Sequence, residues 1–401
     1  MSEGSEQASN QPLIGIIGGG QLGMMMLEAA KGCATRMNKD SEALPPARYR
    51  VLEASRDCPA AYLADELIVG SLKDDDAIRR LADGCSALTW EIEHVNVQTL
   101  MDLEARGKTV IPSPKVLQIV QDKGLQKEFY AKNAIATAPF LLVDSKRIDA
   151  STLDAFPGDQ VVIKARTGGY DGKGVAICSK RDLMKGYRPF EGPVLLETFA
   201  EDALELSVIV AVDQQGNRAC YPSIEMYFHP ISNLVEFLFS PAQTPTSVRE
   251  RAQALALKTV SAFDSPGLFA VELFMLPNGT LWVNEMAPRP HNSGHHSIEG
   301  CATSQFEQLD RILLGLPLGP TDLLQPSAMI NLVGPEALSG SYQLENQEEW
   351  EKSSDVFVHL YRKTETRPHR KLGHVTVIAD TLDELLVRAK QVQKELKIIP
   401  S

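Results

Sequence analysis

The sequence predicts an α/β protein of several domains, and three observations lead to this fold class. With 401 residues, the chain is long enough for roughly two to four compact units. From Leu13 onward, apolar runs of strand length alternate with helical patterns, which is typical of a doubly wound parallel sheet. Further apolar runs flank a Gly-rich loop and an Asn278-Gly279 turn, so a second domain and a β-hairpin are expected to follow.

The composition argues against several classes of protein. A net charge of −12 is unfavourable for a broad nucleic-acid surface, which needs concentrated Lys and Arg. The chain is 43% hydrophobic but has no apolar run of membrane-spanning length. Its six cysteines are scattered without a Cys-x-x-Cys pair, as in a reduced cytoplasmic protein. We therefore expect a cytoplasmic protein that binds neither nucleic acid nor membrane, with a disordered leader at residues 1–12.

Residues 13–115 are expected to form an N-terminal doubly wound, Rossmann-like domain. The run LIGIIGGGQLGMMMLEAAKG has the pattern of a buried strand, a glycine turn and a helix, and RYRVLEA, DELIVG and SALTWEIE supply further strands. Gly18 to Gly23 satisfy G-x-G-x-x-G, and Glu53 ends the next strand, so NAD binding is one interpretation. The other interpretation is a tight turn whose helix N-terminus binds a different anion.

Residues 116–200 contain the strongest signal for nucleotide chemistry. The strand Val161-Val162-Ile163 ends in Lys164, and four glycines follow between Gly168 and Gly174. A fixed cation beside a loop of free backbone N–H groups is a typical phosphate site. A solvated edge lysine next to a plain turn is the alternative. A protein kinase also pairs a strand lysine with a glycine loop, but the chain lacks its HRD and DFG motifs.

The hairpin in residues 201–335 predicts a metal site. If a two-residue turn centres on Asn278-Gly279, Glu272 stands directly opposite Glu285. Two facing carboxylates repel each other, and a divalent cation such as Mg²⁺ would turn this repulsion into binding. Two solvated glutamates are the alternative, although the flanking residues are apolar. A turn one residue longer would break this register.

Two later segments concentrate cationic and hydrogen-bonding side chains. The loop that follows Glu285 contains Arg289 and three histidines, and its Pro and Gly content excludes a helix. We expect an anion pocket in which Arg289 binds a carboxylate or bicarbonate, in preference to a zinc site. Residues 336–401 are expected to form a small β-rich extension that ends in a Lys-rich helix. Its basic cluster from Lys363 to His374 is either a solvated face or part of a sugar-phosphate pocket.

Five of these motifs, in this order, resemble the 5-(carboxyamino)imidazole ribonucleotide synthases, a branch of the ATP-grasp superfamily. They are GGGQLG, TWEIEHV, VVIKARTGGYDGKG, NEMAPRPHNSGH and RPHRKLGH. The resemblance covers nearly the whole chain after the leader and implies an ATP-grasp fold. In that fold, residues 13–115 would form the domain that precedes the ATP-grasp domain. The small ATP-grasp domain with its Gly-rich lid would comprise residues 116–200, and the large ATP-grasp domain residues 201–335. Residues 336–401 would form the C-terminal extension. The resemblance also implies ATP-dependent carboxylation of aminoimidazole ribonucleotide with bicarbonate, a homodimer, and delivery of the product to a fused or separate mutase.

The resemblance also implies roles for individual residues. ATP and its cofactor Mg²⁺ would meet Lys123, Lys164, Gly168, Gly169, Tyr170, Asp171, Gly172, Lys173, Gly174, Glu197, Thr198, Phe199, Ala200, Glu205, His229, Asn284 and Glu285, with Glu272 and Glu285 as the metal ligands. The ribonucleotide would meet Gln21, Leu22, Glu91, Tyr170, Asp171, Asn292, Ser293, Lys363, Arg370 and Lys371. Catalysis would use Arg289, Asp171, Lys371 and His291. Met24, His94, Lys123 and Ala287 depart from the family pattern.

Overall fold

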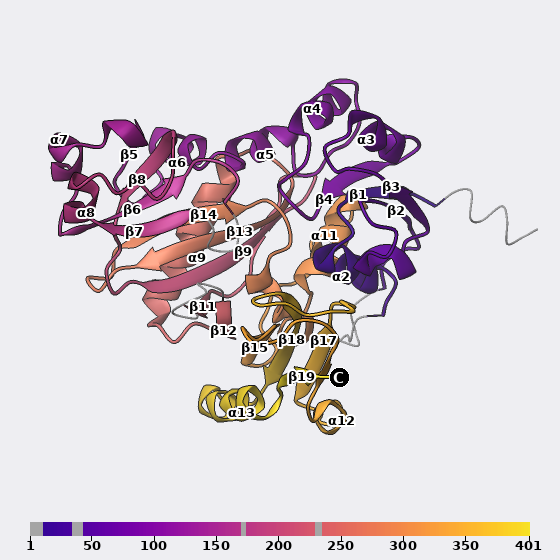
Figure 1. Cartoon of the computed structure of the whole chain (residues 1–401). Helices are drawn as coiled ribbons and strands as arrows, with labels where there is room; N and C mark the ends of the chain where they lie inside the picture. Colours follow the sequence, from indigo (N-terminus) through magenta and orange to yellow (C-terminus); the bar gives the residue numbers. More distant parts are fainter. Residues whose placement is uncertain (1–10, 34–42, 170–173, 229–234) are drawn as a thin grey trace, which may run out of the picture.

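The computed structural model describes residues 11–33, 43–169, 174–228 and 235–401. In these residues the strands form a four-stranded parallel sheet, a four-stranded antiparallel sheet, a nine-stranded sheet and a two-stranded sheet. Figure 1 shows the nine-stranded sheet in the middle, with the N-terminal domain on one side and the small antiparallel sheet on the other. Within the described ranges, no helix is long and apolar enough to cross a membrane.

The N-terminal domain has the predicted alternation of strands and helices. Its sheet runs in the order β3-β2-β1-β4, and every residue of the central strand β1 is buried. Asp74 and Asn96 cap two of its helices, each accepting a hydrogen bond from a backbone N–H three residues ahead. The elements are β1 (Leu13–Ile17), α2 (Gln21–Ala30), β2 (Arg48–Glu53), η1 (Pro59–Tyr62), β3 (Glu66–Val69), α3 (Asp75–Ala82), β4 (Ala87–Trp90) and α4 (Val97–Ala105).

The small antiparallel sheet presents one apolar and one polar face. Two helices, α5 (Pro114–Val120) and α6 (Lys123–Lys132), lead to it from the N-terminal domain. Val161 and Ile163 of β6 pack with Leu153 and Leu183 of the covering helices. Because side chains alternate along a strand, Lys164 therefore projects from the other face. The elements are β5 (Phe140–Asp144), η2 (Ser145–Arg147), α7 (Ala150–Asp154), β6 (Gln160–Ala165), β7 (Val175–Ser179), α8 (Lys180–Met184) and β8 (Pro193–Thr198).

The large sheet is covered on one face by the long helix α9 (Thr246–Ser261). Val248, Ala252 and Ala256 of this helix pack against β9, β13 and β14. The opposite face of the same strands meets α11 (Gln305–Leu313), which also contacts α2 of the N-terminal domain. The remaining elements of this region are β9 (Leu204–Val212), β10 (Arg218–Cys220), β11 (Ile224–Phe228), β12 (Val235–Ser240), β13 (Gly267–Met275), β14 (Leu281–Ala287), η3 (Asn292–Gly294) and α10 (Ser297–Gly300).

The C-terminal residues extend the large sheet. Strands β15 (Ser327–Val333), β18 (Lys371–Ile378) and β17 (Val356–Leu360) follow β12 in the sheet order. Of these strands, β17 and β18 agree with the β-rich character expected of residues 336–401, and the expected Lys-rich helix is α13 (Leu382–Glu395). It packs on β15 and β18 through Leu385, Ala389 and Val392. Two short strands, β16 (Tyr342–Leu344) and β19 (Ile398–Pro400), pair with each other, and α12 (Gln347–Trp350) lies between β16 and β17 in the chain.

Candidate active site

The β13–β14 hairpin brings the two predicted metal ligands together by an unexpected route. Glu272 pairs with Glu285, as predicted. The turn, however, has three residues, because the Leu276 N–H donates to the Thr280 carbonyl at 2.9 Å. The predicted two-residue turn is therefore wrong. A β-bulge next to Glu272 compensates for the extra turn residue and restores the pairing of the two glutamates.

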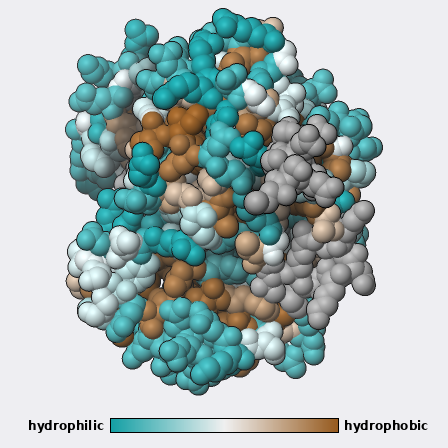
Figure 2. Space-filling model, turned by 90° about the vertical axis from the view of Figure 1, so that its right-hand side faces the viewer, coloured by the Kyte–Doolittle hydropathy of each residue, from teal (hydrophilic) through white to brown (hydrophobic). Residues whose placement is uncertain are grey.

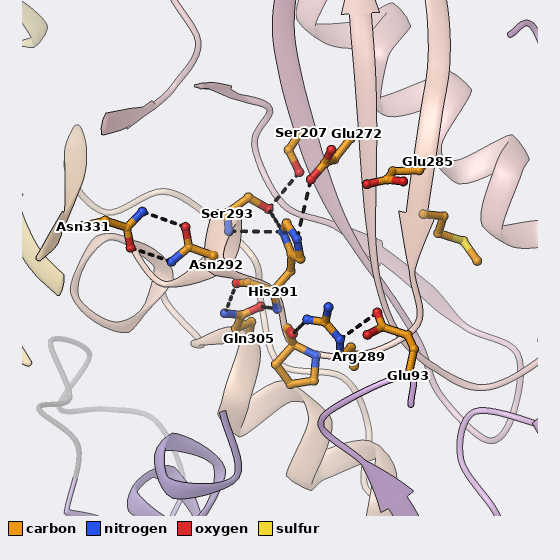
Figure 3. Close-up of polar contacts among 12 residues, drawn as sticks. Glu93, Ser207, Glu272, Glu285, Arg289, His291, Asn292, Ser293, Gln305 and Asn331 are labelled. Carbon is orange, nitrogen blue, oxygen red and sulfur yellow. Dashed lines mark hydrogen bonds and ion pairs between the residues drawn. The ribbon is translucent and has the colours of Figure 1, made fainter. Parts of the chain in front are cut away.

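The bulge also sets the direction of Asn284. Val283 and Met286 both pack in the core under α9, so the two residues between them both project from the opposite face. Asn284 and Glu285 thus share one face of the sheet with Glu272. Figure 3 shows the Glu272 and Glu285 side chains projecting from neighbouring strands toward the same space. The hairpin therefore presents three oxygen-bearing side chains, those of Glu272, Asn284 and Glu285, on one face of the sheet.

Two predicted lysines approach these oxygens. The Lys164 ammonium donates to Asn284 Oδ1 at 2.8 Å and pairs with Glu197 Oε2 at 2.6 Å. Lys123, the first residue of α6, forms an ion pair with Glu285. The small sheet and the hairpin are therefore joined by charge contacts between predicted nucleotide-binding residues.

Lys127 was missed by the sequence analysis. Its Nζ lies 2.5 Å from Glu197 Oε1 and 2.5 Å from Thr137 Oγ1, and its side chain is almost fully buried. A spacing of four residues places Lys123 and Lys127 on one face of a helix, so this spacing was an available signal. The contact to Glu197, which lies 70 positions further along the chain, was not predictable from local pattern.

The two facing glutamates have pKa values shifted in opposite directions. Burial, together with the neighbouring Glu285, raises the pKa of Glu272. The Lys123 ammonium holds the pKa of Glu285 below its usual range. Burial also raises the pKa of Glu205, which lies on the adjacent strand β9, to about 7. Such opposed shifts in one cluster are typical of a functional site.

The donor set of the hairpin fits Mg²⁺ bound together with a nucleotide. Across the described ranges, no group of three or more His, Cys, Asp or Glu side chains is arranged to hold a metal ion. Mg²⁺ commonly takes only one or two protein carboxylates and fills its other positions with phosphate oxygens and water. Glu272 and Glu285 meet that requirement, and Asn284 adds an amide oxygen beside them.

Arg289 contacts the N-terminal domain, and His291 contacts the hairpin (Figure 3). The Arg289 Nε donates to Glu93 Oε1 at 2.8 Å, so a residue just after β4 orients the guanidinium. His291 Nε2 lies 3.5 Å from Glu272 Oε1, and its Nδ1 lies 2.9 Å from Ser293 Oγ. Glu93 was not predicted as a site residue, although it stands within the TWEIEHV motif.

The other two histidines of this loop do not face the carboxylates. His295 and His296 are fully buried. The ring of His295 packs 4.8 Å from that of His374 in the C-terminal part of the sheet. Burial lowers the pKa of both loop histidines. Of the three histidines in this loop, therefore, only His291 lies against the carboxylates.

The glycine turn before α2 already holds an anion of the chain itself. The Glu91 carboxylate accepts hydrogen bonds from the backbone N–H groups of Gly20 and Gly23. Glu53 accepts from the Gly19 N–H at 2.9 Å. A Cβ on Gly18 would lie 2.4 Å from Glu91 Cγ. The helix N-terminus that would bind a dinucleotide pyrophosphate is thus filled, and this argues against the NAD interpretation.

Several of the predicted ribonucleotide residues lie at this turn or interact electrostatically with its carboxylates, whereas Asn292 and Ser293 contact the large sheet. Gln21 and Leu22 begin α2. Burial lowers the pKa of Lys363, which also interacts electrostatically with Arg370, Glu91 and Glu53. Asn292 forms a reciprocal amide pair with Asn331, with both N–O distances at 2.9 Å. Ser293 Oγ lies 2.9 Å from Ser207 Oγ.

The remaining predicted residues are distributed as follows. Thr198 ends β8, Phe199 and Ala200 follow it, and Lys371 begins β18. Gly168 and Gly174 both have positive φ, at 80° and 83°, which a glycine adopts readily. Four residues of the lid, Tyr170, Asp171, Gly172 and Lys173, and also His229, lie outside the described residues.

A lysine-bearing antiparallel sheet that faces a carboxylate hairpin defines the class of this protein as an ATP-grasp ligase. Residues 128–306 match the ATP-grasp domain family, and residues 12–121 match the ribonucleotide synthetase preATP-grasp domain. Residues 327–388 match the phosphoribosylaminoimidazole carboxylase C-terminal domain. The predicted fold class is thereby confirmed.

Similarity to individual proteins identifies the branch. The chain is 37% identical over 369 residues to the N5-carboxyaminoimidazole ribonucleotide synthase of Brucella melitensis, covering 91% of the chain and 96% of that protein. It therefore belongs to the N5-carboxyaminoimidazole ribonucleotide synthases, the ATP-grasp ligases of that name in purine biosynthesis. A phosphoribosylaminoimidazole carboxylase from Ogataea methanolica is 36% identical, with 96% of the chain covering 70% of that protein. The predicted family is confirmed.

Solved structures agree with this assignment. The N5-carboxyaminoimidazole ribonucleotide synthetase from Thermotoga maritima superposes with a TM-score of 0.86 at 39% identity, covering 98% of this chain and all of that one. An Aspergillus clavatus carboxyaminoimidazole ribonucleotide synthase complexed with ATP gives 0.83 at 30% identity, covering 96% and 98%. The Aspergillus clavatus enzyme in complex with ADP and 5-aminoimidazole ribonucleotide gives 0.81 at 29%, with the same coverage.

Proposed function

We propose that the chain carboxylates the amino group of 5-aminoimidazole ribonucleotide with bicarbonate, using MgATP, through carboxyphosphate. The observation that carries this proposal is the joined cluster of Lys164, Glu197, Asn284, Glu285 and Lys123, which spans the small sheet and the hairpin. Its charges match a metal-bound triphosphate. The ATP and ribonucleotide complexes of the Aspergillus clavatus relative support the same choice of substrates.

The first step transfers a phosphoryl group. A bicarbonate oxygen attacks the γ-phosphorus of ATP, the bond to the β-phosphate oxygen breaks, and ADP and carboxyphosphate form. Such transfer depends mainly on positioning and charge neutralisation. Lys164 supplies a fixed cation at the end of β6, and Glu272 and Glu285 would hold Mg²⁺, which neutralises the developing charge. Arg289, oriented by Glu93, would bind the carboxylate of bicarbonate.

The second step forms the carbon–nitrogen bond. The substrate amine attacks the carboxyl carbon of carboxyphosphate, inorganic phosphate leaves, and the nitrogen loses a proton. His291 contacts Glu272 and stands near Arg289 in the loop, so it is our candidate to accept or pass that proton, with Asp171 as the candidate on the lid. The Gly168–Gly174 loop would exclude water, because carboxyphosphate hydrolyses readily.

The ribonucleotide would lie over the glycine turn of the N-terminal domain. Lys363 and Arg370 would provide positive charge for its phosphate. Lys363 interacts electrostatically with Glu91 at the turn. Gln21, Leu22, Glu91, Asn292, Ser293, Lys371, Tyr170 and Asp171 complete the proposed pocket. Contributions from the N-terminal domain, the large sheet and the C-terminal strands would explain why the family keeps all three parts in one chain.

Phosphate release with each reactant omitted in turn tests the substrates. We expect release to require ATP, bicarbonate and 5-aminoimidazole ribonucleotide together, and to stop when Mg²⁺ is chelated. Release that ignores the ribonucleotide would refute the proposed acceptor. MgATP binding without phosphate release under any combination would favour the second candidate, a catalytically silent ATP-binding module.

We also propose a cytoplasmic homodimer whose product passes to a mutase. The chain covers 65% of the chloroplastic phosphoribosylaminoimidazole carboxylase of Vigna aconitifolia, so that relative is considerably longer. Figure 2 shows apolar patches among hydrophilic side chains on one face of the molecule. Exposed apolar patches often mark protein interfaces, which supports self-association. Sedimentation at several concentrations tests the dimer, and a single species with the mass of one chain would refute it.

A further inference from the structure

Lys127 is a buried cation that the proposed mechanism does not use. It lies on α6 with 2% of its surface exposed. Its ammonium contacts Glu197 Oε1 and Thr137 Oγ1, both at 2.5 Å, and the Val283 carbonyl at 3.4 Å. A buried lysine is costly unless its charge is compensated. Its position therefore needs an explanation.

The contacts of Lys127 tie the two halves of the grasp together. Glu197 belongs to β8 of the small sheet, whereas Val283 belongs to β14 and directly precedes Asn284. Thr137 pairs with Val283 in an isolated β-bridge and donates its hydroxyl proton to the Val283 carbonyl at 2.7 Å. Lys127 thus contacts both Glu197, which is the ion-pair partner of Lys164, and the strand of the β13–β14 hairpin that carries Asn284 and Glu285.

Glu197 is shared between two lysines. Its Oε1 faces Lys127 and its Oε2 faces Lys164, at 2.5 Å and 2.6 Å. Two ammonium groups and one carboxylate leave a local net charge of plus one. Without Lys127 the carboxylate would neutralise Lys164, and the local charge would fall to zero. The attraction of this cluster for a triphosphate depends on that remaining charge.

We propose that Lys127 is a positioning residue that neutralises Glu197, so that Lys164 keeps its positive charge for the phosphates of the nucleotide. This inference rests on the proposed function, because it assumes that ATP binds at Lys164. Lys127 itself does not touch the substrate. It acts through Glu197. Its contact with the Val283 carbonyl also fixes the position of β14 relative to α6.

A charge-balanced set of variants tests this role. Lys127→Met should weaken ADP and ATP binding by at least about tenfold, the loss expected for one charge-assisted contact. Adenosine, which has no phosphate, should bind as to the wild type. The double variant Lys127→Met/Glu197→Gln restores the local net charge of plus one and should recover most of the ADP affinity. Lys127→Arg should recover it as well. Lys132→Met, an exposed change on the same helix, is the matched control.

Calorimetric titration with ADP and with adenosine provides the readout, with circular dichroism as a check on folding. The inference is overturned if Lys127→Met binds ADP like the wild type, or if the double variant binds no better than the single one, because a purely structural lysine would give that result. If Lys127→Met does not fold, the double variant decides alone: ADP affinity within about threefold of the wild type supports the inference, and a loss of tenfold or more overturns it. Failure of the wild type to bind ADP would instead refute the proposed function.

Discussion

The facing glutamates make a prediction in which stability and activity change in opposite directions. In Glu272→Gln one of two opposed carboxylates becomes neutral. Paired strand residues place their Cβ atoms about 5 Å apart, and at an effective dielectric constant of about 20 two unit charges at that distance repel by about 3 kcal/mol. The ion pair between Lys123 and Glu285 offsets part of this repulsion. We therefore expect the metal-free variant to be more stable by about 1–2 kcal/mol, while Mg-dependent turnover falls at least about a hundredfold.

The pH dependence of unfolding checks the cause of this effect. The folded state raises the pKa of Glu272 through burial and the nearby Glu285, so folded protein binds a proton more tightly than unfolded protein. The wild type should therefore lose stability as pH rises above the ordinary value of 4.5 toward the raised folded pKa, and the variant should lose less, because only the raised pKa of Glu205 remains in this cluster. Thermal unfolding with and without Mg²⁺ measures both effects, with Glu236→Gln on β12 as a control away from the hairpin. A variant that is less stable than the wild type at pH 8 without Mg²⁺ would refute the reasoning.

Three further changes test other parts of the site. Gly18→Ala should abolish turnover and lower the melting temperature by several degrees, because its Cβ would lie 2.4 Å from Glu91 Cγ. Gly84→Ala, also at positive φ but with open space around it, should lower the free energy of unfolding by only about 1 kcal/mol. Equal losses in the two variants would contradict the steric argument. Arg289→Lys should raise the bicarbonate KM about tenfold or more because lysine cannot bind a carboxylate in bidentate fashion, and an unchanged KM would exclude that contact. Asn331→Ala breaks a buried reciprocal amide pair and should lower the free energy of unfolding by about 1–3 kcal/mol. It should also raise the KM for the ribonucleotide. Denaturant titration that shows no change in stability would mean that the pair is dispensable.

The N-terminal domain was predictable because its signals are local. An apolar run of strand length followed by a glycine turn and a helix specifies one βα unit, and the units of a parallel sheet repeat this pattern. The lysine at the end of β6 was also readable, because strand alternation fixes its face once Val161 and Ile163 are assigned to the core. In both cases the information lies within about ten residues of chain.

The contacts that complete the site were not predictable in this way. Glu93 orients Arg289 across 196 residues, and Lys127 meets Val283 across 156. Nothing in the local pattern of either segment indicates its partner, since a buried lysine and an exposed one have the same helical spacing. The buried His295 is a similar case, because its ring is covered by His374, which lies 79 positions further along the chain.

The hairpin shows how a correct pairing can follow from an incomplete argument. Asn278-Gly279 correctly marks the turn, but the turn takes one more residue than predicted, which alone would have put Glu272 opposite Asn284. The bulge corrects the register and adds something that a regular hairpin cannot provide. In a regular strand Asn284 and Glu285 would point to opposite faces, and only one could reach the proposed Mg²⁺ position. The extra residue turns both toward Lys123 and Lys164 while Val283 and Met286 remain in the core. The longer turn and the bulge therefore work together, and shortening the turn to two residues should keep the hairpin but misalign Asn284.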